Sequence, residues 1–347
     1  MKINDDKKFI ELDHGGGGYK SWELVKEIRQ ILKFKGQWQN CEDDAAIYDL
    51  GKGKLVFTTD AFIVDPIFFP GGDIGKIAMC GTINDLSVMG ARPIGISLSI
   101  VMEEGFLKKD FLQIIKSINK VSRQSGVPVV TGDTKVTGKG KIDKIAVTTA
   151  GVGLARKIIS NNGVKAGDFI IASGDLGVHT IALLSKRFNY RTKIRSDSKP
   201  LNKELAEVGE YLNAAKDPTR GGLAANLVEM AEKAKVKIIL EEKLLPYKKE
   251  TVALTELLGI DIFSLASEGR FIASVSKKNT KLVLNILKKY NKEAKIIGRA
   301  EKMDSRLRGN DKNEHENNKK NYIYLKTNLG TLRPIEMPKG KLIPRIC

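Results

Sequence analysis

The chain has 347 residues, of which 41% are hydrophobic and 29% charged, enough for two globular domains or one large one. No apolar run approaches the length of a membrane span, and the N-terminal segment lacks the apolar core of a signal peptide. Three cysteines without a CxxC pair argue against a disulfide framework and a structural zinc site, so we expect a cytoplasmic protein with no membrane partner.

The net charge of +18, from 59 basic and 41 acidic residues, raises the question of nucleic-acid binding. The lysines are spread through every segment, for example along the predicted helix face of Lys108, Lys109, Lys116 and Lys120. No basic run alternates with aromatic residues, and no helix-turn-helix or RNA-binding signature is present. The pattern therefore predicts a solvated surface and no nucleic-acid partner.

Helix and strand patterns alternate from the N-terminus, which predicts an α/β architecture. Ser21 is expected to cap the first helix, which ends near Gly36. Asp73 is expected to cap another helix, which Gly90 stops. The other elements expected in this half are strands at 45–50, 55–60, 94–102, 127–131 and 142–154, and a helix that ends at Gly126.

The second half predicts a further α/β domain, with strands at 169–173, 236–240, 270–275, 294–298 and 322–326 and helices at 177–186, 203–213 and 221–235. The 303–321 segment is almost wholly polar and is interpreted as a solvated insertion. From Gly330 onward, repeated prolines disfavour helix and predict an extended, mobile tail. The expected divisions are therefore 1–40, 41–156, 157–329 and 330–347.

Six aspartates stand at the ends of apolar elements, where ligands gather in α/β folds. They are Asp43, Asp44, Asp60, Asp85, Asp133 and Asp217. Several carboxylates that converge there would bind a hard cation, and magnesium with a nucleotide phosphate is the common case. Taken singly, each is equally a turn residue or a helix cap, and Asp217 is well placed to cap a helix.

Two glycine-rich segments have the amides and cations that suit phosphate. The first consists of Gly15, Gly16, Gly17 and Gly18, followed by Lys20. It is not a Walker loop, and the alternative is a flexible N-terminal arm. The second follows Asp217, where Thr219 and Arg220 can meet phosphate at a helix start.

Lys135 and Glu268 are candidates for proton transfer, because both follow apolar strands and abut turns. The alternative is an exposed Lys135 and a Glu268 paired with Arg270. Cys347 is the last residue, where a thiol cannot fill a core unless the tail docks, so reactivity is the better explanation. His179 is expected to face solvent.

Seven segments together resemble the HypE family, the carbamoyl dehydratases of nickel–iron hydrogenase maturation. They are HGGGG at 14–18, TTDAF at 58–62, the glycine-rich stretch at 68–93, VTGDTK at 130–135, DPTRGGL at 217–223, SEGR at 267–270 and the terminal PRIC at 344–347. The resemblance covers nearly the whole chain, and the 303–321 insertion departs from the family pattern. It implies the two-domain α/β fold of the aminoimidazole ribonucleotide synthetase superfamily, with ATP binding and dimerisation in the 41–156 domain.

The resemblance also implies a role for each candidate residue. The positions that match Mg²⁺ ligands are Asp44, Asp85 and Asp217. Beside them lie Asp43, Asp60 and Asp133, as candidates either for nucleotide contact or for support of the Mg²⁺ ligands. The loop of Gly15 to Gly18 with Lys20 would close over the phosphates of ATP. The proton-transfer pair matches Lys135 and Glu268, and Cys347 would carry the substrate.

In that family, the carbamoyltransferase HypF is expected to place a carboxamide on Cys347, and ATP drives its dehydration to a thiocyanate. Cyanide then passes to iron on a HypC–HypD complex, and the enzyme is expected to be a homodimer. Selenophosphate synthetases share these motifs but generally carry Cys or selenocysteine in the glycine-rich loop, which has neither here. A non-enzymatic scaffold that binds acidic partners is the third alternative.

Overall fold

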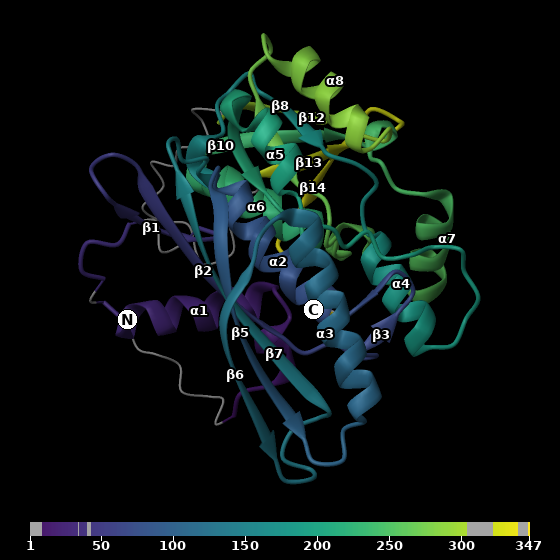
Figure 1. The fold of residues 1–347 in the computed structure, drawn as a ribbon. Coiled ribbons are helices and arrows are strands. Elements are labelled where there is room, and N and C mark those ends of the chain that lie inside the picture. Colours follow the sequence, from purple (N-terminus) through teal and green to yellow (C-terminus); the bar gives the residue numbers. More distant parts are fainter. Residues whose placement is uncertain (1–8, 34, 40–42, 304–321, 339–345) are drawn as a thin grey trace.

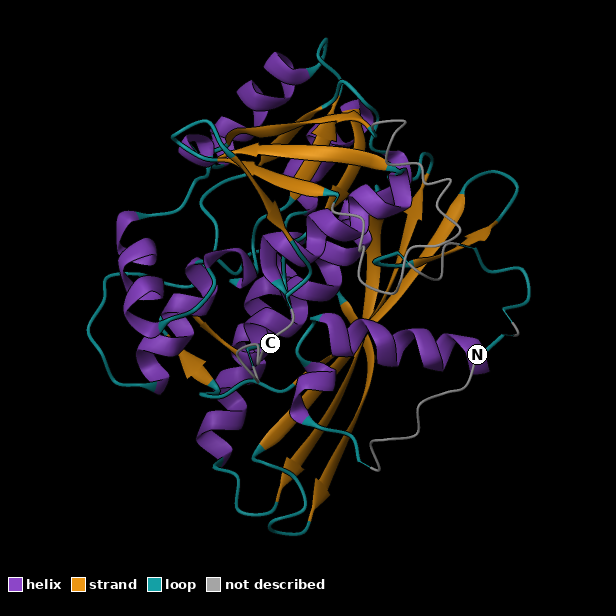
Figure 2. Ribbon diagram, turned by 180° about the vertical axis from the view of Figure 1, so that it is seen from behind, coloured by secondary structure: helices purple, strands orange, loops and turns teal. Residues whose placement is uncertain are grey.

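The computed structural model describes residues 9–33, 35–39, 43–303, 322–338 and 346–347. Within these ranges the chain forms two α/β halves, each built on its own sheet, which confirms the expected two-domain architecture (Figure 1). Seen from behind, the two sheets occupy different ends of the molecule, with helices packed between and around them (Figure 2).

The first sheet has five strands in the order β1-β2-β7-β5-β6. They are β1 (Ala46–Asp49), β2 (Lys54–Phe62), β7 (Ile145–Ala155), β5 (Arg92–Glu103) and β6 (Val129–Thr137). Neighbours pair antiparallel, except that β5 and β6 pair parallel. Along β2, buried Val56 and Thr58 alternate with exposed Phe57 and Thr59, so one face of the sheet covers a core. Strand β6 forms an exposed edge.

Helix α2 (Ile74–Val88) packs on this sheet and beside α3 (Lys108–Ser125), and nearly all of its residues are buried. Asp73 caps α2 as predicted, because its carboxylate accepts the backbone N–H of Lys76 at 2.9 Å. Helix α3 ends at Gly126, also as predicted, and the φ of 75° there is the left-handed conformation that glycine adopts without strain.

The second sheet has seven strands in the order β14-β13-β10-β12-β8-β11-β9. They are β14 (Leu332–Ile335), β13 (Ile323–Lys326), β10 (Val236–Glu241), β12 (Lys295–Lys302), β8 (Phe169–Ala172), β11 (Ile272–Val275) and β9 (Leu212–Lys216). Strands β10 and β13 pair parallel, and the other pairs are antiparallel.

The other helices surround these sheets. They are α1 (Tyr19–Ile31), α4 (Val178–Arg187), α5 (Asn202–Val208), α6 (Gly222–Ala234), α7 (Lys249–Leu258) and α8 (Thr280–Tyr290). Short 3₁₀ turns are η1 (Leu12–Gly15), η2 (Asn161–Gly163), η3 (Gly209–Tyr211), η4 (Glu242–Leu244) and η5 (Ile262–Ser264), and a small ribbon pairs β3 (Phe68–Phe69) with β4 (Gly72–Asp73). No helix within the described ranges is both long and apolar enough to cross a membrane.

Helix α2 also joins the two halves. Its fully buried Asn84 donates through the side-chain amide to the carbonyl oxygens of Lys199 and Glu268, each at 3.3 Å. The side-chain carbonyl oxygen of Asn84 accepts the backbone N–H of Leu201 at 2.8 Å. One apolar cluster contains residues from both halves and from the chain end, where Ile346 is buried. The two halves therefore share a core.

Three local predictions are wrong. Gly18, not Ser21, is the N-cap of α1, and the Ser21 hydroxyl donates instead to the His14 carbonyl at 2.7 Å. The helix expected at 203–213 is α5 followed by η3, because Leu212–Lys216 joins the sheet as β9. Helices α7 and α8 and strand β14 have no counterpart among the predicted elements.

The structure places the two ends of the predicted tail. Strand β14 pairs antiparallel with β13, and Pro334 lies opposite Tyr324 in that edge strand. At the other end Ile346 is only 6% exposed. The intervening 339–345 segment lies outside the described residues, as does 304–321, which is most of the polar insertion.

Candidate active site

Four aspartates from separate elements form an acidic cluster, namely Asp44 before β1, Asp60 in β2, Asp85 in α2 and Asp217 after β9. The pKa of Asp85 is raised well above its usual range, first by burial and then by the charges of Asp60, Asp217 and Asp44. Burial, followed by the charge of Asp44, raises the pKa of Asp217 to about 8. The charges of these carboxylates thus raise one another's pKa values, so these four predicted site residues do converge.

Two lysines that the sequence analysis did not single out balance part of this charge. The Lys216 ammonium group contacts Asp44, and Lys233 lies 2.7 Å from a carboxylate oxygen of Asp43. Even so, Oδ2 of Asp44 and Oδ2 of Asp217 are buried without a hydrogen-bond partner in the described part of the chain. Unpaired buried carboxylate oxygens favour a hard cation, so the donor set fits Mg²⁺.

The acidic cluster is not a preformed metal cage. Among the described residues, no three His, Cys, Asp or Glu side chains are arranged so that they could hold a metal ion as they stand. Because Lys216 occupies one side of Asp44, Mg²⁺ binding would require the lysine or the carboxylates to move. Asp217 is also not a helix cap, since α6 begins at Gly222 with Gly221 as its N-cap.

The two predicted phosphate loops lie against each other. The Arg220 guanidinium donates to the Gly15 carbonyl at 3.1 Å, and Gly17, with a φ of 81°, leaves no room for a side chain beside Arg220. Gly16 follows η1, and Gly18 precedes α1. The neighbouring cavity of about 290 Å³ is lined by Gly17, Trp22, Lys216, Thr219, Arg220 and Lys233, among others. An aromatic ring among cations suits a nucleotide with its phosphates.

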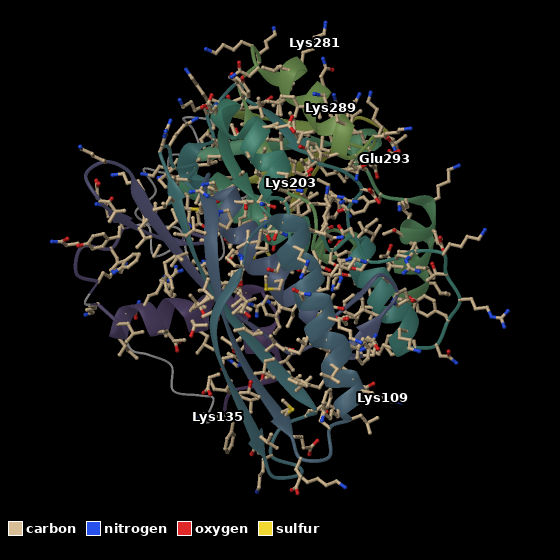
Figure 3. The ribbon with its side chains drawn as sticks, in the orientation of Figure 1. Lys109, Lys135, Lys203, Lys281, Lys289 and Glu293 are labelled. Atoms are coloured by element: carbon tan, nitrogen blue, oxygen red, sulfur yellow. The ribbon has the colours of Figure 1, made fainter. Side chains whose placement is uncertain are left out.

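Three of the predicted contacts are engaged elsewhere or exposed. Lys20 forms ion pairs with Glu11 and Asp13 at 2.9 and 3.1 Å. Asp133 and Lys135 lie on the edge strand β6, where their side chains are 66% and 73% exposed and 4.0 Å apart. Figure 3 shows Lys135 at the outer margin of the first sheet. Within one chain, the structure therefore does not bring Lys135 to the buried Glu268.

Glu268 is buried, and the alternative pairing with Arg270 is wrong. Glu268 is 2% exposed, and its Oε1 has no hydrogen-bond partner in the described ranges. Arg270 instead forms an ion pair with Asp175 at 3.1 Å. The pKa of Glu268 is raised well above its usual range, mainly by burial and then by Asp217 and other carboxylates. A carboxylate with a raised pKa is a stronger base, which suits proton transfer.

The last residue of the chain lies beside this site. The backbone N–H of Ile63 donates to a Cys347 carboxylate oxygen at 3.4 Å, and both ribbon views place the C-terminus near the middle of the molecule. Burial raises the pKa of the Cys347 thiol, and the next influence is the charge of Glu268. Asp60 and Asp217 act in the same direction, and Arg220 opposes them. The Cys347 thiol thus lies within electrostatic reach of Glu268, Asp60 and Asp217.

His179 does not face solvent as expected. It is fully buried in the first turn of α4, and its Nε2 lies 2.8 Å from the Ile346 carbonyl oxygen. The sequence offered no signal for this contact, because the two residues are 167 positions apart. Lys216, by contrast, directly precedes Asp217 at the end of β9, and this position next to a candidate metal ligand is a signal that the sequence does contain.

Comparison with known proteins gives the class first. The N-terminal domain of AIR synthase related proteins matches residues 42–155, and the C-terminal domain of the same proteins matches residues 165–308. The chain is therefore a two-domain AIR synthase related protein.

Full-length relatives narrow this class. A hydrogenase expression/formation protein of Methanocaldococcus jannaschii is 41% identical, over 96% of this chain and 98% of its own. Carbamoyl dehydratase HypE of Rhizobium leguminosarum is 35% identical, over 97% of this chain and 95% of its own. The chain belongs to the HypE carbamoyl dehydratase family.

Solved structures agree with this assignment. HypE in a HypE–HypF complex superposes with a TM-score of 0.80 at 35% identity, covering 91% of this chain and 99% of that one. A HypE in complex with ATP gives a TM-score of 0.78 at 32% identity, covering 98% of this chain and all of the other.

Proposed function

We propose that this protein uses ATP to dehydrate a carboxamide carried on the Cys347 sulfur to a thiocyanate. The observation that supports the proposal is the docked C-terminus, where the Cys347 carboxylate accepts the Ile63 N–H at 3.4 Å and the charge of Glu268 acts on the Cys347 thiol. ATP is the expected second substrate, since a related HypE binds it and the cavity next to the acidic cluster offers Trp22, Lys216 and Arg220.

The reaction balances without a redox partner. The amide oxygen of the carboxamide attacks the γ-phosphorus of ATP, so an O–P bond forms and the bond to ADP breaks. The two amide protons are then lost, one through Glu268 to solvent and one to the departing phosphate, as the C–O bond breaks and leaves S–C≡N on Cys347. The products are ADP, phosphate and the thiocyanate.

The residues of the chain have separate tasks in this scheme. Asp44, Asp85 and Asp217 would hold Mg²⁺, which neutralises phosphate charge when bound. Arg220 and the amides of the glycine loop would bind the phosphates. Buried Glu268, with its raised pKa, would accept an amide proton.

Lys135 stays a prediction as the second proton-transfer group. Its side chain is 73% exposed on the edge strand β6, away from Glu268. It would reach a site of this kind only if a second copy met that edge, which is where the expected homodimer would form.

The partners follow from the same chemistry. A docked Cys347 thiol with a raised pKa is a poor nucleophile, so its carbamoylation requires the tail to leave the site. The carbamoyltransferase would be HypF, because a related HypE forms a complex with HypF. Delivery of cyanide to a HypC–HypD iron complex in the cytoplasm would complete the cycle.

The test is mass spectrometry of the C-terminal peptide. The protein is incubated with HypF, carbamoyl phosphate and ATP, and the peptide is followed over time. A carboxamide should appear on Cys347 and then lose one water to give the cyano adduct. The matched control is Cys347→Ala, which should carry neither group. Modification of Cys41 or Cys80 in place of Cys347, or a carboxamide that never loses water with ATP present, would refute the proposal. Selenide-dependent phosphoryl transfer, the rival activity, should be absent.

A further inference from the structure

His179 belongs to no part of the chemistry described above, yet it is fully buried and contacts the end of the chain. A carbonyl oxygen can only accept a hydrogen bond, so the Ile346 carbonyl, 2.8 Å away, requires the proton to be on Nε2. The other ring nitrogen, Nδ1, lies 2.8 Å from the Ser196 hydroxyl, and in a neutral ring with its proton on Nε2 it is the acceptor of that contact. The hydroxyl proton then points at Nδ1 and not at Ser198 Oγ, which is 3.1 Å away. The imidazole is therefore fixed as one tautomer, with its N–H directed at the tail.

The surroundings of His179 hold the ring rigidly. Phe69 packs edge-on against it with ring centroids 5.3 Å apart. Ser196 is itself held, since its backbone N–H donates to the Pro70 carbonyl at 2.8 Å and its Oγ accepts the Ser198 N–H at 3.2 Å. Burial lowers the pKa of His179, so the ring is neutral and keeps a single N–H. A rigid donor of this kind suits recognition of a fixed acceptor.

The tail offers the matching half of the contact. The Ile346 side chain is buried in the cluster that joins the two halves, so its carbonyl has a defined position. Cys347 comes next in the chain, and its carboxylate is bound by the Ile63 N–H. Fixing the residue on one side and the carboxylate on the other leaves the thiol a small range of positions beside Glu268.

We propose that His179 is a positioning residue, which binds the Ile346 carbonyl of the docked tail and thereby holds Cys347 at the dehydration site. Its role in catalysis rests on the proposed function, but its role in docking does not. His179 touches neither the carboxamide nor ATP in this scheme. His179 binds the main chain, so its hydrogen bond depends on the position of the tail and not on a tail side chain. The buried Ile346 side chain determines which carbonyl lies opposite His179.

Two variants of similar polarity separate docking from folding. His179→Gln places an amide N–H near the position of Nε2 and can still reach Ile346. His179→Asn is shorter, places its amide near Nδ1 and can serve only Ser196. Neither variant puts an apolar side chain next to the Ser196 hydroxyl.

The assay is the rate of alkylation of Cys347 by iodoacetamide in the full-length protein without nucleotide, measured by peptide mass spectrometry. Cys80 is a fully buried thiol in the same core cluster, so its labelling reports loosening of the core. Loss of one buried hydrogen bond should make His179→Asn label at Cys347 roughly five- to tenfold faster than native, with His179→Gln close to native and Cys80 unchanged. Equal Cys347 rates in all three proteins, or Cys80 labelling that rises together with Cys347, would overturn the proposal.

A second arm distinguishes this inference from the proposed function. Each protein is first carbamoylated by HypF and then mixed with ATP for one turnover. The cyano adduct should form more slowly in His179→Asn and at the native rate in His179→Gln. If protection of Cys347 depends on His179 but no variant makes the adduct, the proposed function fails and the docking role stands. If all variants make the adduct equally fast with equal protection, the docking role fails and the function stands.

Discussion

Asp217 should make the protein less stable than its neutral analogue, because it is a buried carboxylate near the charges of Asp44 and Asp60. It is 4% exposed, its Oδ2 has no hydrogen-bond partner in the described ranges, and its pKa is raised from 3.8 to about 8. The folded chain therefore retains a proton that the unfolded chain loses between these two values. The stability is full below pH 3.8 and falls as the pH rises through about 8.

The size of the effect follows from the two pKa values. Each pH unit between them contributes about 1.4 kcal/mol, so an ionisable Asp217 lowers the free energy of unfolding by about 2 kcal/mol at pH 5 and about 5 kcal/mol at pH 8. Asp217→Asn removes this dependence. Without metal, the variant should gain about 3 to 4 kcal/mol on the native protein between pH 5 and pH 8.

Urea unfolding at the two pH values, in EDTA and in excess Mg²⁺, measures this difference. Mg²⁺ should stabilise the native protein and have less effect on Asp217→Asn, because the variant lacks a ligand. Asp168→Asn is the matched control: that buried carboxylate accepts three hydrogen bonds, from Lys165, Asn213 and Ser274, so its loss should destabilise at both pH values. A pH-independent difference between native and Asp217→Asn would refute the reasoning.

Two further predictions each compare a variant with a matched control. Gly17→Ala should weaken ATP binding in calorimetry by roughly tenfold, because its methyl group would clash with Arg220 and its φ of 81° is left-handed. In the control, Gly15→Ala, the methyl group meets no atom within 4 Å, so ATP should bind normally. Equal affinities of the two variants for ATP would contradict the loop packing. Arg270→Ala should lower the free energy of unfolding by about 3 kcal/mol in a urea titration, because it removes a buried partner of Asp175. The control is Arg299→Ala, at a side chain that is 64% exposed, and it should cost under about 1 kcal/mol. Similar losses in the two variants would show that burial does not determine how much these ion pairs stabilise the fold.

Local rules account for the elements that the sequence predicted well. The cap at Asp73 and the end of α3 at Gly126 depend on backbone chemistry within a few residues, so a single segment contains the whole signal. Strand β9 has no such signal. Leu212–Lys216 is extended because β11 pairs with it, and that partner lies about sixty positions later in the chain.

The acidic cluster and the two phosphate loops were predicted as separate motifs, and the fold brings them together. Aspartate, glycine and arginine residues at strand ends already indicate a ligand site, so residue type and position along the chain were enough to select them as candidates. The contacts of His179 and Arg270 could not be predicted in this way. Each depends on a residue far along the chain, Ile346 in one case and Asp175 in the other. The long-range partner of a single polar residue is decided by how distant segments pack, and the residues around it in the sequence carry no signal for that packing.

The electrostatics of the docked site separate the two halves of the proposed reaction. Carbamoyl transfer needs a thiolate at Cys347, but burial and the charge of Glu268 raise the thiol pKa in the docked position. A carboxamide is neutral, as the protonated thiol is, so the loaded tail can dock without burying a charge. The thiocyanate is neutral as well, so its release requires something else to change, and in the proposed reaction that change would be the departure of phosphate from the site beside Arg220. On this reasoning the charge of the bound nucleotide, more than that of the tail, would decide whether Cys347 stays docked.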